Sequence, residues 1–284
     1  LDLMTDGEWV WADKTSLGGD NGIAVAMILA ILADDTLAHP PIEAVFTVDE
    51  EVGMDGAFAL DCSDLKGRKL LNLDSELEGV FTVSCAGGMR ADCHLPGAME
   101  PVSGMSGYAV TLSGLQGGHS GADIHLGRAS ANQQMGRVLY SAMERFPGLR
   151  LAAVSGGQFD NVICSRCDAV VAIPAGKEAA FEAFIAEFDA VLKNEYTGCD
   201  DGITLACART DVTAAISEVT TNIMLHTLLA LPQGVQAMSV DFPGLTQTSL
   251  NMGVLKLEKD GLHITFSIRS SIASQKEMLA QRVH

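Results

Sequence analysis

Residues 45–56 read Val-Phe-Thr-Val-Asp-Glu-Glu-Val-Gly-Met-Asp-Gly, a β-favouring run that passes into three consecutive carboxylates and then into glycines. A short apolar run bounded by turn signals is typical of a buried strand in a parallel sheet. In open α/β sheets, ligands bind outside the carboxyl ends of the strands. Adjacent carboxylates repel one another unless a cation holds them. The stretch therefore predicts an α/β fold with either a metal site, in which Glu50 and Glu51 divide metal binding and proton transfer, or a solvated acidic turn.

Carboxylates recur at comparable places along the first part of the chain. Asp20 lies in a glycine-rich turn, Glu50 and Glu51 follow one predicted strand, and Asp74 follows another. Because the carboxyl ends of neighbouring parallel strands meet at one edge of a sheet, we expect these side chains to converge there. The pattern favours the metal site over the solvated turn.

The composition limits the classes of function that the chain can have. With 284 residues, 48% of them hydrophobic, the chain is long enough for two domains and a sizeable core. A formal net charge of -18 argues against a nucleic-acid backbone as partner. The most apolar run, residues 23–33, is shorter than the roughly 20 residues that cross a bilayer, and no signal segment opens the sequence. The seven irregularly spaced cysteines predict no disulfide framework. We therefore expect a reduced cytoplasmic protein without a membrane partner.

The first part of the chain predicts an incomplete α/β domain. Residues 23–33 are apolar nearly all round, which predicts a buried helix. Residues 42–48 and 69–73 are predicted strands of a mostly parallel sheet, and Trp9 and Trp11, which alternate with polar residues, predict an edge hairpin.

Residues 96–107 are rich in glycine, proline and serine, which predicts a domain boundary, and the sequence pattern changes after them. Beyond them the order strand, helix, strand, strand, helix, strand predicts an α+β sandwich, with helices on one face of a largely antiparallel sheet. The predicted strands are 108–115, 149–155, 168–173, 203–208, 253–257 and 263–268, and the predicted helices are 128–146, 177–196, 217–231 and 270–284.

Several motifs together carry a resemblance to a known family. They are Leu-Gly-Gly-Asp-Asn-Gly at 17–22, the acidic stretch at 48–56, Asn-Leu-Asp-Ser-Glu at 72–76, Cys-Ala-Gly-Gly at 85–88, Gly-Gly-His-Ser-Gly at 117–121, Thr-Ser-Leu-Asn at 248–251 and Ile-Arg-Ser-Ser at 268–271. In this order and spacing, they resemble the aminoacylhistidine dipeptidases (Xaa-His dipeptidases, carnosinase-like peptidase D). These enzymes belong to a superfamily of two-metal aminopeptidases, dipeptidases and deacylases.

The resemblance implies a dizinc site, in which Co²⁺ or Mn²⁺ can substitute. Asp20 would bridge the two ions, Glu51 would ligate one and Asp74 the other. Glu50 would be the general base and acid. Two metals polarise the scissile carbonyl and lower the pKa of water, and a neighbouring carboxylate must carry the proton.

The resemblance also implies substrate-binding residues and a homodimer. His119 would stabilise the tetrahedral oxyanion, often in the active site of the partner subunit. Asn161 and Arg269 would hold the dipeptide, with the guanidinium of Arg269 on its C-terminal carboxylate. Without the resemblance, His119 could equally satisfy loop backbone and Arg269 could be a surface charge. His125 is expected to be structural.

The sequence departs from the family pattern in three places. Cys164 to Cys167 replaces a strand that usually carries Ile-Pro-Arg, although Arg166 remains. The family's His-x-Asp metal element before the glycine turn and its His-Ala-Gly-Leu-Glu element far downstream are not in this sequence. The expectation is a middle portion of a longer protein that is inactive alone.

The predicted domains follow from this expectation. Residues 1–103 would be the N-terminal part of the metal-dependent catalytic domain, 104–270 a lid and dimerisation domain, and 271–284 the start of the return into the catalytic domain.

The predicted function is a metal-dependent dipeptidase that cleaves Xaa-His dipeptides such as β-alanyl-histidine. One alternative is a broader dipeptidase or an N-acyl amino acid deacylase that uses the same site. The other is a non-catalytic piece that acts only as a dimerising lid domain.

Overall fold

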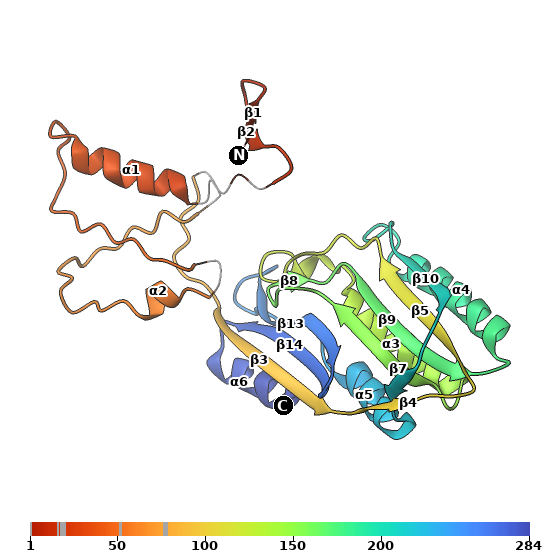
Figure 1. Ribbon diagram of the computed structural model, residues 1–284. Helices are drawn as coiled ribbons and strands as arrows, with labels where there is room; N and C mark the ends of the chain where they lie inside the picture. The colour runs from red at the N-terminus through yellow and green to blue at the C-terminus, as the bar shows by residue number, and fades with distance from the viewer. Residues whose placement is uncertain (1, 16, 18–20, 51–52, 76–78) are drawn as a thin grey trace. The chain divides into compact units, whose positions relative to one another are not determined.

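The chain divides into two compact units in a computed structural model, Leu1–Val83 and Ser84–His284 (Figure 1). The structure describes residues 2–15, 17, 21–50, 53–75 and 79–284. The division falls between the motif-rich first part of the sequence and the predicted sandwich. Each unit is described by itself below.

The first unit contains a hairpin, one long helix and one short helix. Strands β1 (Leu3–Thr5) and β2 (Val10–Ala12) pair antiparallel, which confirms the predicted hairpin. Helix α1 (Gly22–Ala33) is capped by Asn21, whose Oδ1 accepts a hydrogen bond from the backbone N–H of Ala24. Helix α2 spans Asp55–Phe58.

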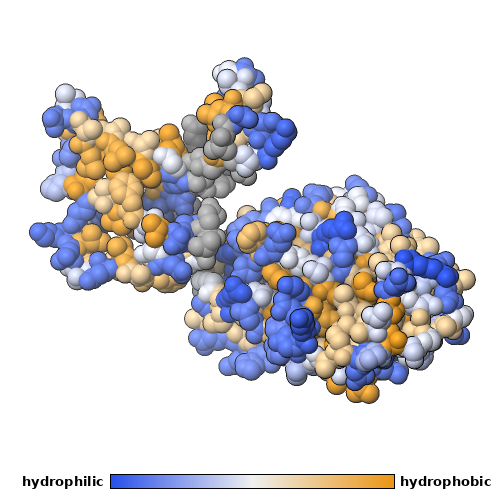
Figure 2. Space-filling model, in the orientation of Figure 1, coloured by the Kyte–Doolittle hydropathy of each residue, from blue (hydrophilic) through white to orange (hydrophobic). Residues whose placement is uncertain are grey.

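Two predictions for the first unit are wrong. Residues 42–48 and 69–73, predicted as strands, have no strand structure. Leu70 and Leu71 in the second of these segments are 88% and 84% exposed, and a strand needs neighbouring strands to pair its backbone groups. Helix α1 is not buried either, because only its Ala24 is buried, and apolar residues colour the surface around it in Figure 2.

The second unit is built on an eight-stranded sheet with strand order β10-β5-β9-β7-β13-β14-β3, in which β12 also pairs with β13. All of these pairs are antiparallel. The strands are β3 (Gly87–Pro96), β5 (Met105–Ser113), β7 (Arg150–Gly156), β9 (Cys167–Pro174), β10 (Thr204–Thr210), β12 (Gly234–Met238), β13 (Thr246–Glu258) and β14 (Gly261–Ser270). Two small pairs stand outside this sheet, β4 (Met99–Pro101) with β11 (Ala214–Ile216), and β6 (Gly118–His119) with β8 (Val162–Ile163).

Helices cover one face of this sheet (Figure 1). They are α3 (Ala131–Arg145), α4 (Glu178–Glu195), α5 (Glu218–Ala230) and α6 (Ala273–Val283), and a 3-10 turn, η1, spans Ile124–Leu126. Alternate residues of β14 from Leu262 to Ile268 are buried in the core beneath the helices, whereas His263 to Arg269 lie on the other face. The predicted α/β class is confirmed, as is the largely antiparallel sheet with helices on one face.

The sheet is larger than the sequence predicts. Strand β12 was not predicted, and β13 extends well before the predicted start at residue 253. The added part of β13 contains Thr248, Ser249 and Asn251, which are polar and buried. Hydrophobic periodicity cannot detect such a segment.

Strand β3 pairs with β14 along its whole length and therefore belongs to the second unit. The assignment of residues 1–103, 104–270 and 271–284 to functional domains stays a prediction. All seven cysteines are free thiols. Among the described helices, none has the length and apolar character needed to cross a bilayer.

Candidate active site

The acidic stretch forms a closed loop in the first unit. The backbone N–H of Gly56 donates to the carbonyl of Val48 (3.2 Å), and that of Met54 donates to Asp49 (2.8 Å). A Cβ atom on Gly56 would lie 2.6 Å from the backbone N and O of Val48, so only glycine permits this approach. Glu50 thus lies on a turn.

Asp74 lies beside the start of α1. The Nδ2 of Asn21 donates to Asp74 Oδ1 at 3.4 Å, while the Oδ1 of Asn21 caps the helix. The backbone N–H of Asp74 donates to Asn72 Oδ1 (2.9 Å). A carboxylate is a Zn²⁺ ligand, and an amide that hydrogen-bonds it fixes its orientation, so this arrangement fits a divalent-cation ligand. The predicted ligands Asp20 and Glu51 lie outside the described residues.

In the second unit, His119 is held in a short strand and a tight loop. Strand β6 pairs with β8, with His119 opposite Val162. The backbone N–H of His119 donates to Asp123 Oδ2 (2.9 Å), and the N–H of Asp123 donates back to the carbonyl of His119 (2.8 Å). The backbone at His119 is therefore fixed on both sides.

The same loop selects one tautomer of the His119 ring. The backbone N–H groups of Gly121 and Ala122 donate to His119 Nδ1 at 3.2 and 3.1 Å. Since Nδ1 accepts, the neutral ring carries its proton on Nε2. His119 is exposed, so this Nε2–H is a donor available to an oxygen outside the loop.

Arg269 meets His119 at Gly121. A Cβ atom on Gly121 would lie 3.0 Å from His119 Cε1 and 3.2 Å from Arg269 Cζ, so both side chains border the same point. Arg269 lies near the end of β14, opposite Gly88 of β3, which has no side chain to cover it. Its Nε is buried and has no hydrogen-bond partner in the described part of the chain. A buried unpaired guanidinium nitrogen is costly, and a planar carboxylate suits it.

The backbone of Asn161 contacts the loop that carries His119. Its carbonyl accepts a hydrogen bond from the N–H of Ser120 (2.7 Å). The side-chain amide of the buried Asn251 in β13 donates through Nδ2 to the carbonyls of Asp160 and Val162, the residues before and after Asn161, both at 2.8 Å. The structure therefore brings together the predicted residues His119, Asn161 and Arg269.

A further residue that sequence reasoning missed supports the loop. Asp200 is fully buried, and its two oxygens accept hydrogen bonds from the backbone N–H groups of Gln116 and Ala129, each at 2.7 Å. These two contacts close both ends of the loop that carries His119. The neighbouring Asp201 is exposed, and nothing in the sequence distinguishes the two carboxylates.

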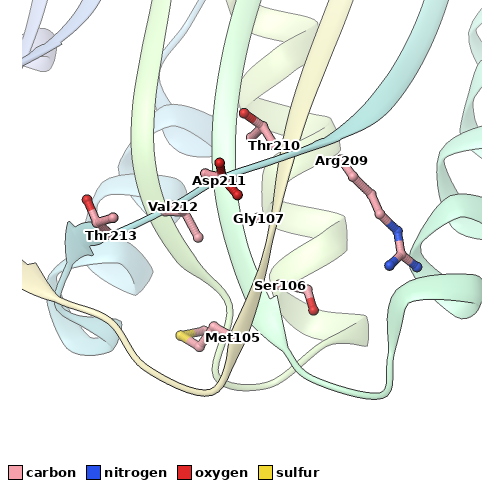
Figure 3. A pocket seen from close by; sticks show the side chains of 8 residues that line it. All are labelled: Met105, Ser106, Gly107, Arg209, Thr210, Asp211, Val212 and Thr213. Atoms are coloured by element: carbon pink, nitrogen blue, oxygen red, sulfur yellow. The ribbon is translucent and has the colours of Figure 1, made fainter.

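A surface hollow at the opposite end of β5 is separate from these residues (Figure 3). It lies where Gly107 of β5 pairs with Thr210 of β10, whereas His119 follows the other end of β5. It is lined by Met105, Ser106, Gly107, Arg209, Thr210, Asp211, Val212 and Thr213. No predicted site residue lies in it.

Comparisons with known proteins agree with the motifs. Residues 110–198 match the family described as "Peptidase dimerisation domain". The chain is 38% identical, over 275 residues, to the cytosol non-specific dipeptidase of Escherichia coli (strain K12), covering 96% of this chain and 56% of that protein. The crystal structure of the aminoacylhistidine dipeptidase from Vibrio alginolyticus is 36% identical and superposes with a TM-score of 0.78, covering 99% of this chain and 58% of that one.

The chain thus spans a little over half the length of these two dipeptidases. The resemblance that the motifs predicted is confirmed: residues 110–198 match the peptidase dimerisation domain family, and over the part that it spans, the chain is similar in sequence and fold to an aminoacylhistidine dipeptidase.

Proposed function

We propose that the protein to which this chain belongs is a metal-dependent dipeptidase that hydrolyses Xaa-His dipeptides, with β-alanyl-histidine as a representative substrate. The observation that carries the proposal is the buried Nε of Arg269, which has no hydrogen-bond partner among the described residues and lies beside the His119 ring at Gly121. A free dipeptide has a terminal carboxylate for the guanidinium, and its peptide carbonyl becomes an oxyanion during hydrolysis.

The first unit would supply the hydrolytic groups. Asp20, Glu51 and Asp74 would hold a pair of divalent ions, zinc by preference, and the contact between Asn21 and Asp74 supports this because Asn21 follows Asp20 directly. When bound, such a pair polarises the scissile carbonyl and lowers the pKa of water. Glu50 would take a proton from the attacking water and pass it to the leaving amine.

The second unit would supply the groups that hold the substrate. His119, with its proton on Nε2, would donate to the developing oxyanion. Arg269 would bind the terminal carboxylate, and Asn161, whose two neighbours accept hydrogen bonds from the side chain of Asn251, would bind a polar group of the dipeptide. None of these three roles requires a change in the loop hydrogen bonds described above.

The assembly and the domains follow the same proposal. A homodimer is supported by the dimerisation-domain match at residues 110–198. Residues 1–103 and 271–284 would belong to the catalytic domain and 104–270 to the lid. A cytoplasmic location is supported by the name of the Escherichia coli relative and by the free cysteines.

Hydrolysis by the whole protein loaded with Zn²⁺ tests the proposal. We expect turnover of β-alanyl-histidine and none of an N-acetyl amino acid. The Glu50→Gln variant should retain bound zinc and lose turnover, because an amide cannot carry the proton. The matched control is Glu8→Gln, an exposed glutamate of the same unit, which should leave turnover unchanged.

The other outcomes separate the alternatives. Cleavage of the N-acetyl amino acid in place of the dipeptide would favour a deacylase, and equal cleavage of many dipeptides would favour a broader dipeptidase. A protein that dimerises but cleaves none of them would be a lid module without catalysis. Turnover retained in Glu50→Gln would remove Glu50 from proton transfer.

A further inference from the structure

Two histidines and an aspartate gather at the end of the β3–β14 ladder, away from every residue used above. His94 of β3 lies directly opposite His263 of β14. The two rings stack, with centroids 4.4 Å apart and planes at 19°. Asp260, in the turn between β13 and β14, lies 2.9 Å from His263 Nε2 through Oδ1, and 3.6 Å from His94 Nε2 through Oδ2.

The three groups lie close enough together to hold one metal ion. Both histidines place Nε2 beside Asp260, although His94 Nε2 lies nearer the backbone carbonyl oxygen of Asp260 (3.2 Å) than its carboxylate. One ligand atom from each of the three residues lies within 4.8 Å of the others. Directly opposed residues in an antiparallel pair are the closest cross-strand neighbours, so the backbone holds both rings in place. In the described part of the chain, this is the one such group.

The local backbone is shaped for this approach. Gly261 has φ 145°, and a Cβ atom on it would lie 2.9 Å from His94 Nε2 and 2.1 Å from the carbonyl of Leu95. Glycine at this position therefore lets the turn that carries Asp260 come close to His94.

The charge beside the group is balanced. Lys256 lies opposite His263 on β13, and its ammonium pairs with Glu258 at 2.7 Å. A metal cation next to His263 would therefore be repelled less by Lys256, because Glu258 offsets the lysine's positive charge.

We propose that His94, His263 and Asp260 bind one divalent first-row transition-metal ion of the Zn²⁺ class, with the remaining positions taken by water. Two imidazoles and one carboxylate are the donors that such ions prefer. The rings lie on the sheet surface, so solvent can fill the open positions. The bound ion would tie the edge strand β3 to β14.

The site is independent of the proposed dipeptidase residues. His263 and Arg269 share the face of β14 opposite the helices but lie six positions apart, about 20 Å at ~3.3 Å per residue. Occupation of the site therefore neither requires nor implies hydrolysis.

Equilibrium dialysis of the chain against Zn²⁺ alone tests the proposal. We expect the double variant His94→Ala/His263→Ala to bind one zinc ion fewer per chain than the wild type. The control, His39→Ala/His125→Ala, removes two other exposed histidines and should bind as the wild type does. Any zinc held by Asp20, Glu51 and Asp74 is common to all three proteins and cancels in the comparison.

A second measurement identifies the ligands directly. Zinc titration followed by NMR should shift the ring signals of His94 and His263. The Asp260→Asn variant should bind zinc at least roughly 10–100-fold more weakly, since loss of a group that only hydrogen-bonds a metal ligand already weakens metal binding by this factor. Equal zinc content in the wild type and the double variant, or ring shifts at other histidines only, would overturn the proposal.

Discussion

Gly121 sets the geometry of the substrate-binding residues. Its missing side chain leaves space in which the His119 ring and the Arg269 guanidinium both approach the loop backbone. The same residue donates its N–H to His119 Nδ1 and so helps to fix the ring tautomer. Gly121 thus helps to position the side chains of His119 and Arg269, and it also helps to fix the tautomer of the His119 ring.

Replacement of Arg269 by alanine should raise KM for dipeptides with a free carboxylate in the whole protein. Hydrogen bonds to charged groups contribute about 1.5–3 kcal/mol, so KM should rise on the order of tenfold or more. Steady-state kinetics with β-alanyl-histidine measure this. The matched control is the C-terminally amidated dipeptide, for which the variant and the wild type should differ little. An unchanged KM for the free acid would contradict the carboxylate contact.

Replacement of Asp200 by asparagine should destabilise the second unit. The fully buried carboxylate accepts from two backbone N–H groups, and an amide has only one oxygen to offer them. An unsatisfied buried donor costs about 1–3 kcal/mol, which denaturant unfolding measures. Asp201→Asn is the control, because Asp201 is exposed and its Oδ1 accepts a hydrogen bond from the backbone N–H of Gly198. Equal stabilities for the two variants would show that Asp200 does not anchor the loop.

At the residue scale, the sequence predicts the residues that would contact the substrate better than the residues that hold them in place. His119 and Arg269 stand in recognisable motifs, and the structure places them together. Asp200 stands beside a second aspartate, and only the fold decides which of the two is buried. Glu50 lies in a turn, Asp74 follows a segment that lacks the predicted strand, and Asp20 and Glu51 lie outside the described residues.

At the element scale, strands with polar buried residues are the ones that sequence patterns miss. The start of β13 carries Thr248 and Asn251, whose side chains bond Ser270 and the loop that holds Asn161. Their burial serves hydrogen bonding, so no apolar alternation marks the strand. The strands of the central sheet with apolar alternation, such as β5 and β9, were predicted within a few residues.

The first turn of α4 gives a pH-dependent contribution to stability. Ser106 donates to Glu178 Oε1 (2.6 Å), as does the N–H of Gly176 (3.1 Å), and these bonds lower the pKa of Glu178 to about 2. Because the folded-state pKa is depressed, this stability is fully present above the unfolded pKa, near 4.5, and is lost as pH falls towards 2. We expect Ser106→Ala to raise the pKa of Glu178, measured by NMR titration of its carboxyl group.

A hydroxyl at the other end of the β5–β10 ladder provides the control for that titration. Thr204→Ala removes a hydroxyl that donates to the carbonyl of Gly202 and does not contact Glu178, so it should leave the Glu178 titration unchanged. If Ser106→Ala also leaves it unchanged, the Ser106 bond does not set the pKa.

At the scale of the whole molecule, the two units differ in how they bury apolar surface. The second unit has one continuous core beneath its helices. In the first unit, α1 and the segments around residues 42–48 and 69–73 expose most of their apolar side chains. Sequence patterns predict strands and a buried helix there because they read local preference, whereas burial and strand pairing depend on neighbours. This difference explains why the predicted strands and the predicted buried helix are wrong for these segments of the first unit.

The same difference predicts the order of proteolysis. Segments with few buried contacts open at low free-energy cost, so trypsin should cut the chain between residues 66 and 70 before it cuts the second unit. Lys66, Arg68 and Lys69 are exposed and lie outside helices and strands. Mass spectrometry should show an early, persistent fragment that begins near Leu70 and retains the second unit. A variant with glutamine at these three positions should lose the early cut there. Early cleavage at Lys177 or Lys259, within the second unit, would show instead that the large sheet opens as readily as the first unit does.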